Sequence, residues 1–162
     1  MTWRWPTITR RVAPKRPPLL ISVLAPRLLK RISKANVAIY RASDGRLAGH
    51  ELGLPLCLLT TTGRKSGLSR TTPLIFMPDG DRLVLVASQG GLPKHPMWFL
   101  NLRANPDVRV QIRAQTLSMH ARVADETERT QLWPRLIAHN PRWARYQSWT
   151  DRVIPVVICE PI

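Results

Sequence analysis

The sequence predicts a small antiparallel β-barrel with helices packed outside it, a mainly β fold of the α+β class. Apolar, strand-like runs follow one another through tight turns at residues 63–67 and 78–81, and such turns join antiparallel neighbours. Helical stretches separate the later runs, which places helices around a small closed sheet. A chain of 162 residues, 44% of them hydrophobic, suits one domain and is short for two.

The positive charge is concentrated at the N-terminus. The net charge is +15, yet residues 1–41 hold ten Lys and Arg and no Asp or Glu, whereas residues 42–162 hold fifteen and ten. We therefore expect a flexible, basic, proline-rich arm over residues 1–25 and a single barrel domain over residues 26–162. Because the charge gathers in an arm away from most of the aromatic residues, we expect no nucleic-acid partner.

The first element of the domain is predicted to be a basic amphipathic helix over residues 26–41. Leu28, Ile32, Ala35 and Ile39 are spaced to share one helical face, and Lys and Arg occupy much of the rest. Such a helix suits two roles, docking on an anionic lipid surface or packing on the barrel with its basic side in water. The sequence leaves both roles open.

The remaining elements follow in order. Apolar or alternating runs predict the strands, and Pro96, Asp125 and Pro141 mark where helices start or stop. The expected strands are residues 54–62, 70–77, 82–87, 108–112, 116–123 and 154–159, and the expected helices are residues 96–104 and 125–139, with a short helix after Pro141. The glycine-containing stretch 88–91 is expected to interrupt the sheet.

Several kinds of site are excluded by what the sequence lacks. Its two cysteines, Cys57 and Cys159, lie in apolar runs, which predicts buried thiols and excludes a disulfide scaffold. The four histidines are scattered, so we expect no metal site. No GxGxxG segment suggests a nicotinamide site. The uncharged stretch 17–26 is too short to cross a bilayer and makes a poor secretory signal.

The turn at residues 63–67 is the first candidate site. It reads Gly-Arg-Lys-Ser-Gly, and Arg70 follows it. Two cations, a hydroxyl and free backbone amides in one turn suit a phosphate or a carboxylate. The alternative is an ordinary solvated loop, and the sequence around the turn does not decide between the two.

Two further segments could line a ligand. Residues 88–101 combine two glycines, the cation of Lys94 and the start of a helix, which suits a bound ligand as well as a loop that places Trp98 in the core. A second set of rings either packs in the core or walls a pocket for a flat apolar molecule. It comprises Trp133, Trp143, Tyr146 and Trp149.

A series of motifs, in order along the chain, resembles the deazaflavin-dependent nitroreductase family of actinobacteria. The resemblance covers about residues 20–161. It is carried by Leu58-Leu-Thr-Thr-Thr-Gly-Arg-Lys-Ser-Gly67, Arg70, Pro73-Leu74, Ala87-Ser88, Gly90-Gly91, Lys94, Pro96-Met-Trp98, Asn101-Leu, Ala104-Asn-Pro106, Tyr146-Gln-Ser-Trp-Thr-Asp-Arg152, Ile154-Pro155 and Cys159-Glu-Pro161.

The resemblance implies a split β-barrel related to FMN-binding, pyridoxamine oxidase-like proteins. It implies coenzyme F420, an 8-hydroxy-5-deazaflavin with a phosphate and an oligoglutamate tail, as cofactor. The implied activity is hydride transfer from reduced F420 to a quinone or nitro-type acceptor, with a non-catalytic F420-binding module as the alternative. It also implies a cytoplasmic protein in peripheral contact with the inner face of the plasma membrane. The natural acceptor and the oligomeric state stay open.

The resemblance also assigns residues to these roles. Ser88 and Tyr146 are the catalytic candidates, for orienting the acceptor or supplying its proton. Ile75, Asn140, Trp143 and Tyr146 fall on the substrate side. The cofactor residues are Arg64, Lys65, Ser66, Arg70, Thr71, Thr72, Pro73, Leu74, Val86, Ala87, Ser88, Gln89, Lys94, Met97, Trp98, Phe99, Leu100 and Asn101.

This chain departs from the family at the substrate side. A nitroreductase of the family has tyrosines where this chain has Ile75, Asn140 and Trp143, which puts activity on bulky nitroimidazoles in doubt. It has lysine where this chain has Gln89. That change removes one cation but leaves the basic turn intact.

Overall fold

The computed structural model describes residues 26–162, with side chains from residue 34 onward. The predicted arm over residues 1–25 lies outside the described part. The elements, in chain order, are α2 (Pro26–Ala42), β1 (His50–Glu51), β2 (Leu54–Thr62), β3 (Ser69–Asp79), β4 (Arg82–Val86), the 3-10 turn η1 (Gln89–Gly91), α3 (Met97–Ala104), β5 (Asp107–Ile112), β6 (Gln115–Val123), α4 (Glu126–His139), α5 (Arg142–Ser148) and β7 (Val156–Pro161).

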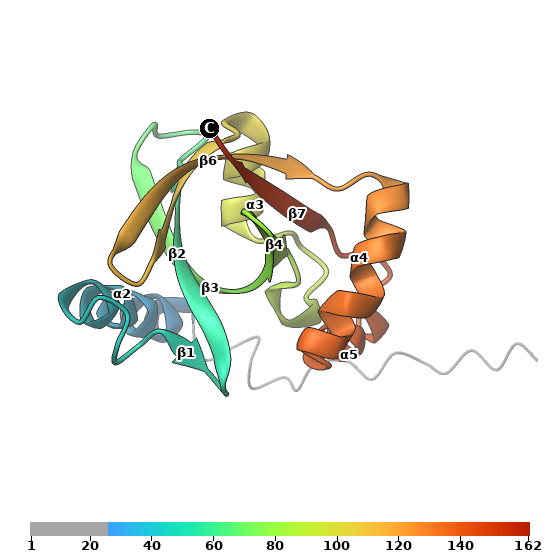
Figure 1. Cartoon of the computed structure of the whole chain (residues 1–162), viewed down its shortest axis with the longest axis horizontal. Helices are drawn as coiled ribbons and strands as arrows, with labels where there is room; N and C mark the ends of the chain where they lie inside the picture. The colour runs from blue at the N-terminus through green and yellow to red at the C-terminus, as the bar shows by residue number, and fades with distance from the viewer. Residues whose placement is uncertain (1–25) are drawn as a thin grey trace, which may run out of the picture.

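The strands form one antiparallel sheet that closes into a barrel. The sheet order is β1-β2-β3-β4-β7-β6-β5, and an added pairing of β2 with β5 closes its six long strands (Figure 1). In the closing pair, Leu58, Leu59 and Thr60 oppose Gln111, Val110 and Arg109. The predicted barrel with outer helices is therefore confirmed.

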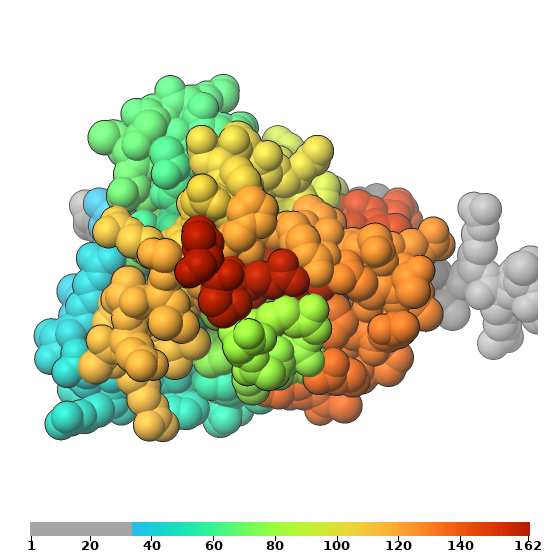
Figure 2. Space-filling view, turned by 45° about the horizontal axis from the view of Figure 1, so that its top comes forward, coloured from blue at the N-terminus to red at the C-terminus, as the bar shows by residue number. Residues whose placement is uncertain are grey.

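The C-terminal strand completes the barrel wall. It lies between β4 and β6. In the space-filling view the red C-terminal strand runs between the light-green turn that joins β3 to β4 and the orange strand β6 (Figure 2). This strand begins two residues later than the sequence predicts, at Val156. The short strand β1 (His50–Glu51) is not among the strands that the sequence predicts.

Alternation along the strands builds two hydrophobic cores. In β4, Leu83 and Leu85 point into the barrel and belong to the inner core. Val84 and Val86 point out toward α4 and α5 and belong to the outer core, which lies between the barrel and these helices. β7 repeats the pattern with Val157 and Cys159 inside. Side chains alternate between the two faces of a strand, so a strand covered on both faces is apolar at every position.

Both cysteines are buried in the barrel as free thiols, as the sequence predicts. Burial raises the pKa of the Cys159 thiol to about 12 and shifts the pKa of Cys57 in the same direction. A buried thiol with a raised pKa is unreactive. These two residues therefore belong to the core and not to a reactive site.

The predicted first helix is present, but another face of it packs on the barrel. Tyr40 is 1% exposed; its hydroxyl donates to the Leu56 carbonyl at 3.0 Å and accepts from the Arg113 amide at 2.9 Å. Ala35 is exposed, and Ile39 is 44% exposed. The predicted apolar face therefore looks away from the barrel over its described part; Leu28 and Ile32 lie outside the residues with described side chains.

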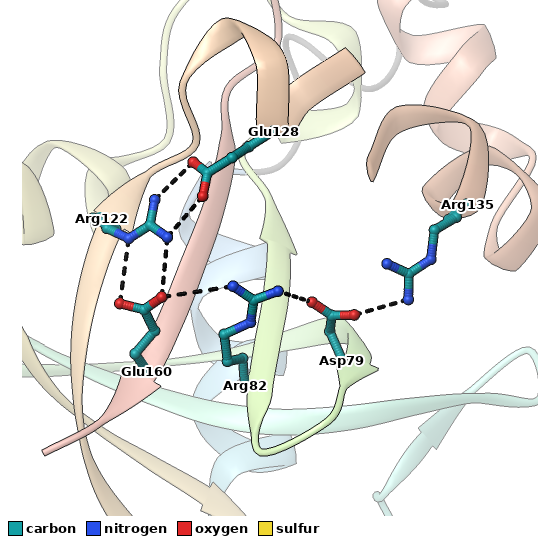
Figure 3. A network of polar contacts seen from close by, with 6 residues as sticks. All are labelled: Asp79, Arg82, Arg122, Glu128, Arg135 and Glu160. Atoms are coloured by element: carbon teal, nitrogen blue, oxygen red, sulfur yellow. Dashed lines mark hydrogen bonds and ion pairs between the residues drawn. The ribbon is translucent and has the colours of Figure 1, made fainter. Parts of the chain in front are cut away.

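An ion-pair network joins α4 to the outer wall of the barrel (Figure 3). The Arg122 guanidinium donates to both oxygens of Glu128, at 2.7 and 2.8 Å, and to Glu160 at 3.0 Å. Glu128 also accepts from the Asp125 amide at 3.0 Å, which completes a capping box at the start of α4, where the sequence predicts that the helix begins. Arg122 and this amide hold the pKa of Glu128 at about 2.

The network continues across the β3–β4 turn (Figure 3). Arg82 lies 3.7 Å from Glu160 and also pairs with Asp79. Asp79 in turn accepts from Arg135 of α4 at 2.8 Å. The two guanidinium groups hold the pKa of Asp79 below its usual range. Paired carboxylates therefore tie the helix layer to the strands.

Glu128→Gln is expected to lower the free energy of unfolding at neutral pH by about 1–2 kcal/mol. The folded-state pKa of Glu128 lies below 4.5, so its ionised carboxylate stabilises the fold above that pH and loses this contribution as the pH falls toward 2. Urea unfolding of both proteins across this range measures the difference. Glu126→Gln removes a carboxylate from the same helical turn outside the network and serves as control. A difference that stays constant down to pH 2 contradicts the prediction.

Candidate functional site

The basic turn between β2 and β3 has a fixed backbone. The Gly63 amide donates to the Leu68 carbonyl at 2.9 Å, and the Gly67 amide donates to the Gly63 carbonyl at 2.8 Å. Gly67 has a φ of +66°, which favours glycine. At Gly63 a Cβ atom would lie 2.7 Å from the Ser66 Oγ, so a side chain there would displace that of Ser66. The turn leaves the three side chains between the glycines exposed.

Asn101 of α3 holds this turn in place. Its side chain is buried, and its Oδ1 accepts from the Arg64 amide at 3.2 Å while its Nδ2 donates to the Thr61 Oγ1 at 3.3 Å. Both ends of the amide thus bind the protein. The turn is positioned by a helix that follows it by more than thirty residues along the chain.

A groove of about 760 Å³ opens beside the turn. β3, the turn, the start of α3 and one side of α2 line it. The predicted cofactor residues that meet there are Arg64, Lys65, Ser66, Arg70, Thr71, Thr72, Met97, Trp98 and Asn101. The structure thus brings together the basic turn and the start of α3, which are separate candidate sites in the sequence.

The groove is positively charged. Lys34, Arg64, Lys65 and Arg70 line it, and no Asp or Glu does. None of these four cations takes part in an ion pair within residues 34–162. Unpaired cations around a concave surface attract an anionic ligand. The groove is therefore suited to a phosphate or carboxylate-bearing molecule.

Three groove residues were not predicted, namely Lys34, Val37 and Ser69, whereas Gly63 belongs to the turn that the sequence marks as a candidate site. Lys34 and Val37 belong to α2, and Arg41 one turn further on donates to the Thr71 Oγ1 at 3.2 Å. Thr71 also shares a hydrogen bond of 2.9 Å with Thr60. The spacing of Lys34, Val37 and Arg41 marks one helical face, which is the signal that could have identified this wall of the groove.

A second cluster forms where the loop after β4 meets α5. Ser88 is buried at the start of η1, and a Cβ atom on Gly91 would lie 2.8 Å from the Tyr146 carbonyl. The rings of Tyr146 and Trp149 lie 5.6 Å apart. The two catalytic candidates, Ser88 and Tyr146, therefore belong to elements that pack directly on each other.

Other predicted site residues do not line the groove. Asn140 and Trp143 are buried; the Asn140 Oδ1 accepts from the Arg142 amide, and Trp143 stacks on His139 in the outer core. Ile75 packs against the same core. Lys94 and Gln89 are exposed. The remaining members of this set are Pro73, Leu74, Val86, Ala87, Phe99 and Leu100.

Within residues 26–162, no helix is both long enough and apolar enough to cross a membrane. No group of His, Cys, Asp or Glu in the same range is arranged to hold a metal ion.

A family model and a relative of this chain carry the same description. A model of the F420H(2)-dependent quinone reductase family matches residues 32–161. An F420H(2)-dependent quinone reductase of Mycobacterium tuberculosis (strain ATCC 25618 / H37Rv) is 40% identical over 133 residues, which is 79% of this chain and 89% of that protein.

Solved structures agree with these sequence matches. The structure of an F420-H2 dependent reductase (FDR-A) is 44% identical with a TM-score of 0.61, and the match covers 65% of this chain and 94% of that one. A structure described as a domain-swapped dimer is 38% identical with a TM-score of 0.64, and the match covers 82% of this chain and 98% of that one.

Proposed function

The chain belongs to the F420H(2)-dependent quinone reductase family. We propose that its basic groove and the loop after β4, residues 87–92 (the Ser88 loop), together serve the family's reaction. The protein is an oxidoreductase whose cofactor is coenzyme F420. Reduced F420 supplies a hydride from C5 of its ring to the quinone, which also takes up a proton and becomes the hydroquinone. This membership favours an enzyme over a non-catalytic F420-binding module.

The observation that carries the proposal is the unpaired charge of the groove. Lys34, Arg64, Lys65 and Arg70 line a concave surface without an acidic neighbour, and a phosphate with an oligoglutamate tail needs such cations. Arg64, Lys65 and Ser66 would hold the phosphate region on the turn that Asn101 fixes. The residues present therefore fit the anionic half of F420.

The acceptor is assigned to the cluster at the Ser88 loop. Ser88 and Tyr146 belong to neighbouring elements, and either hydroxyl could orient a quinone oxygen or supply its proton. Met97 and Trp98, at the start of α3, line the groove. In this arrangement the protein aligns donor and acceptor, and alignment of two reactants lowers the barrier substantially.

A quinone fits this chain better than a bulky nitro compound. Asn140 and Trp143 are buried in the outer core, and Ile75 packs against it. These positions thus present no tyrosine hydroxyl to an acceptor. We propose quinones as the acceptor class, with reduction of nitro compounds a secondary activity.

The full-length chain is expected to bind F420 more tightly than riboflavin phosphate, because the groove cations match a longer anionic tail. A fluorescence titration with each molecule measures both affinities, and the affinity for F420 should fall as salt is added. Anaerobic oxidation of reduced F420 by menadione then tests turnover. Equal or tighter binding of riboflavin phosphate contradicts the cofactor assignment. Binding of F420 without oxidation would support the binding-module alternative.

Lys65→Ala is expected to weaken F420 binding by about 1–3 kcal/mol, the range for a lost charge-assisted contact. Lys65 is exposed, so the circular dichroism spectrum and melting temperature should not change. Arg46→Ala removes an exposed cation outside the groove and should leave the affinity as it is. Unchanged affinity in Lys65→Ala would mean that the turn is an ordinary solvated hairpin.

We further propose that α2 contacts the anionic inner face of the plasma membrane. Over its described part, its outer side presents the exposed Ala35 and Ile39 to lipid, while the exposed cations Lys34 and Arg41 lie on the neighbouring face that walls the groove. Each cation near an anionic surface contributes about 1 kcal/mol. The inner side of the same helix faces the barrel through Tyr40, so docking would not require the fold to open.

The full-length chain is expected to pellet with phosphatidylglycerol vesicles at low salt, and Ile39→Glu should reduce the pelleted fraction several-fold. Val123→Glu is the matched control, because Val123 is 43% exposed and Ile39 is 44% exposed. The predicted contact is wrong if the wild-type chain stays in the supernatant, or if both variants pellet equally well.

A further inference from the structure

Arg152 donates three hydrogen bonds to the backbone of the loop that follows β4. Its Nη2 donates to the Ser88 carbonyl at 2.7 Å, its Nε donates to the Leu92 carbonyl at 3.0 Å, and its Nη1 donates to the Ala87 carbonyl at 3.2 Å. One planar guanidinium thus fixes three peptide groups within six residues of chain. The five donors of arginine form a rigid fork, which lysine cannot reproduce.

The guanidinium has no carboxylate partner within residues 34–162. Its fourth neighbour is the Nδ1 of His95, at 3.4 Å. Burial and the nearby Arg152 charge lower the pKa of His95, so His95 is neutral at physiological pH and can accept this hydrogen bond. A partly buried cation satisfied only by neutral acceptors keeps its charge available to the groups around it.

The backbone of Arg152 is itself tied to α5. The Gln147 Nε2 donates to the Arg152 carbonyl at 2.8 Å, and the Gln147 Oε1 accepts from the Ile154 amide at 2.9 Å. Arg129 of α4 also reaches this oxygen, at 3.4 Å. Hydrogen bonds through Gln147 therefore fix Arg152 to α5 and α4, and Arg152 in turn fixes the loop.

The loop needs this support because its backbone is unusual. Gln89, Gly90 and Gly91 have φ values of +47°, +64° and +77° in succession. A residue with a side chain in this region costs about 1–2 kcal/mol. Since the Ser88–Gln89 peptide bond is trans, the Gln89 N–H points opposite to the Ser88 carbonyl to which Arg152 donates. The N–H therefore faces away from the guanidinium.

We propose that Arg152 is a positioning residue that orients the Ser88–Gln89 peptide, so that the Gln89 N–H donates to a carbonyl oxygen of the bound reactants as that oxygen gains negative charge. The inference rests on the proposed function, which places the reactants at this loop. The charge on the Ser88 carbonyl side polarises the peptide and strengthens its N–H as a donor. Arg152 acts through the peptide and touches no reactant.

The test compares the full-length wild type with Arg152→Ala and Arg152→Lys in reduction of menadione by reduced F420. Both variants should lose about 10-fold or more in kcat, in the range of a misplaced donor, while the Kd for F420 stays within about threefold, because the basic groove is unchanged. Rates are expressed per F420-binding site, so a partly unfolded preparation does not mimic the effect. Arg109→Lys, an exposed arginine on β5, is the control and should match the wild type.

Guanidinium chloride at millimolar concentration should restore part of the kcat of Arg152→Ala, whereas sodium chloride at the same ionic strength should not. Unchanged kcat in a folded Arg152→Lys overturns the proposal, as does failure of both variants to fold, which would give Arg152 a purely structural role. A loss confined to F420 affinity also overturns it. A wild-type chain that binds F420 but reduces no quinone contradicts the proposed function, and the proposal with it.

Discussion

The closure of the barrel by β2 and β5 is the constraint on which the rest of the structure depends. β2 pairs with β3 as far as Thr62 but with β5 only as far as Thr60. The last residues of β2 and the first of β3 therefore extend beyond the closed wall as a two-stranded ribbon. The basic turn stands at the end of this ribbon, where water and a ligand can reach it. Asn101 prevents the ribbon from moving freely, because it ties the turn to α3.

Paired and unpaired charges lie in different parts of the molecule. On the outer wall, Asp79, Glu128 and Glu160 form ion pairs with the arginines of β4, β6 and α4 (Figure 3). Around the groove, the four lining cations have no such partners within residues 34–162. Acidic residues thus serve the attachment of α4 to the barrel, and the uncompensated charge remains where an anionic coenzyme would bind.

The C-terminal segment connects the helix layer to the loop after β4. Val84 and Val86 of β4 pack against α4 and α5 on the outer core, and the loop after this strand lies against α5 at Gly91. Arg152 then links the segment between α5 and β7 to the same loop. A substitution in the outer core can therefore alter the loop without touching a reactant, since packed elements move together.

The sequence alone determined the hairpins, the basic turn and the capping box of α4, because these depend on residues close together in the chain. The sequence motifs also revealed the resemblance to the family, and that resemblance identified most of the residues that line the groove. Only the tertiary structure decided which face of α2 is buried. Tyr40 rather than Ile39 meets the barrel, since a helical face is chosen by what packs against it and not by its own pattern. Three further features could not be predicted from the sequence. They are the closing pair of β2 and β5, the position of Lys34 in the groove, and the hydrogen bonds from Arg152 to the Ser88 loop. Each joins segments far apart in the chain, and no local spacing records such a contact.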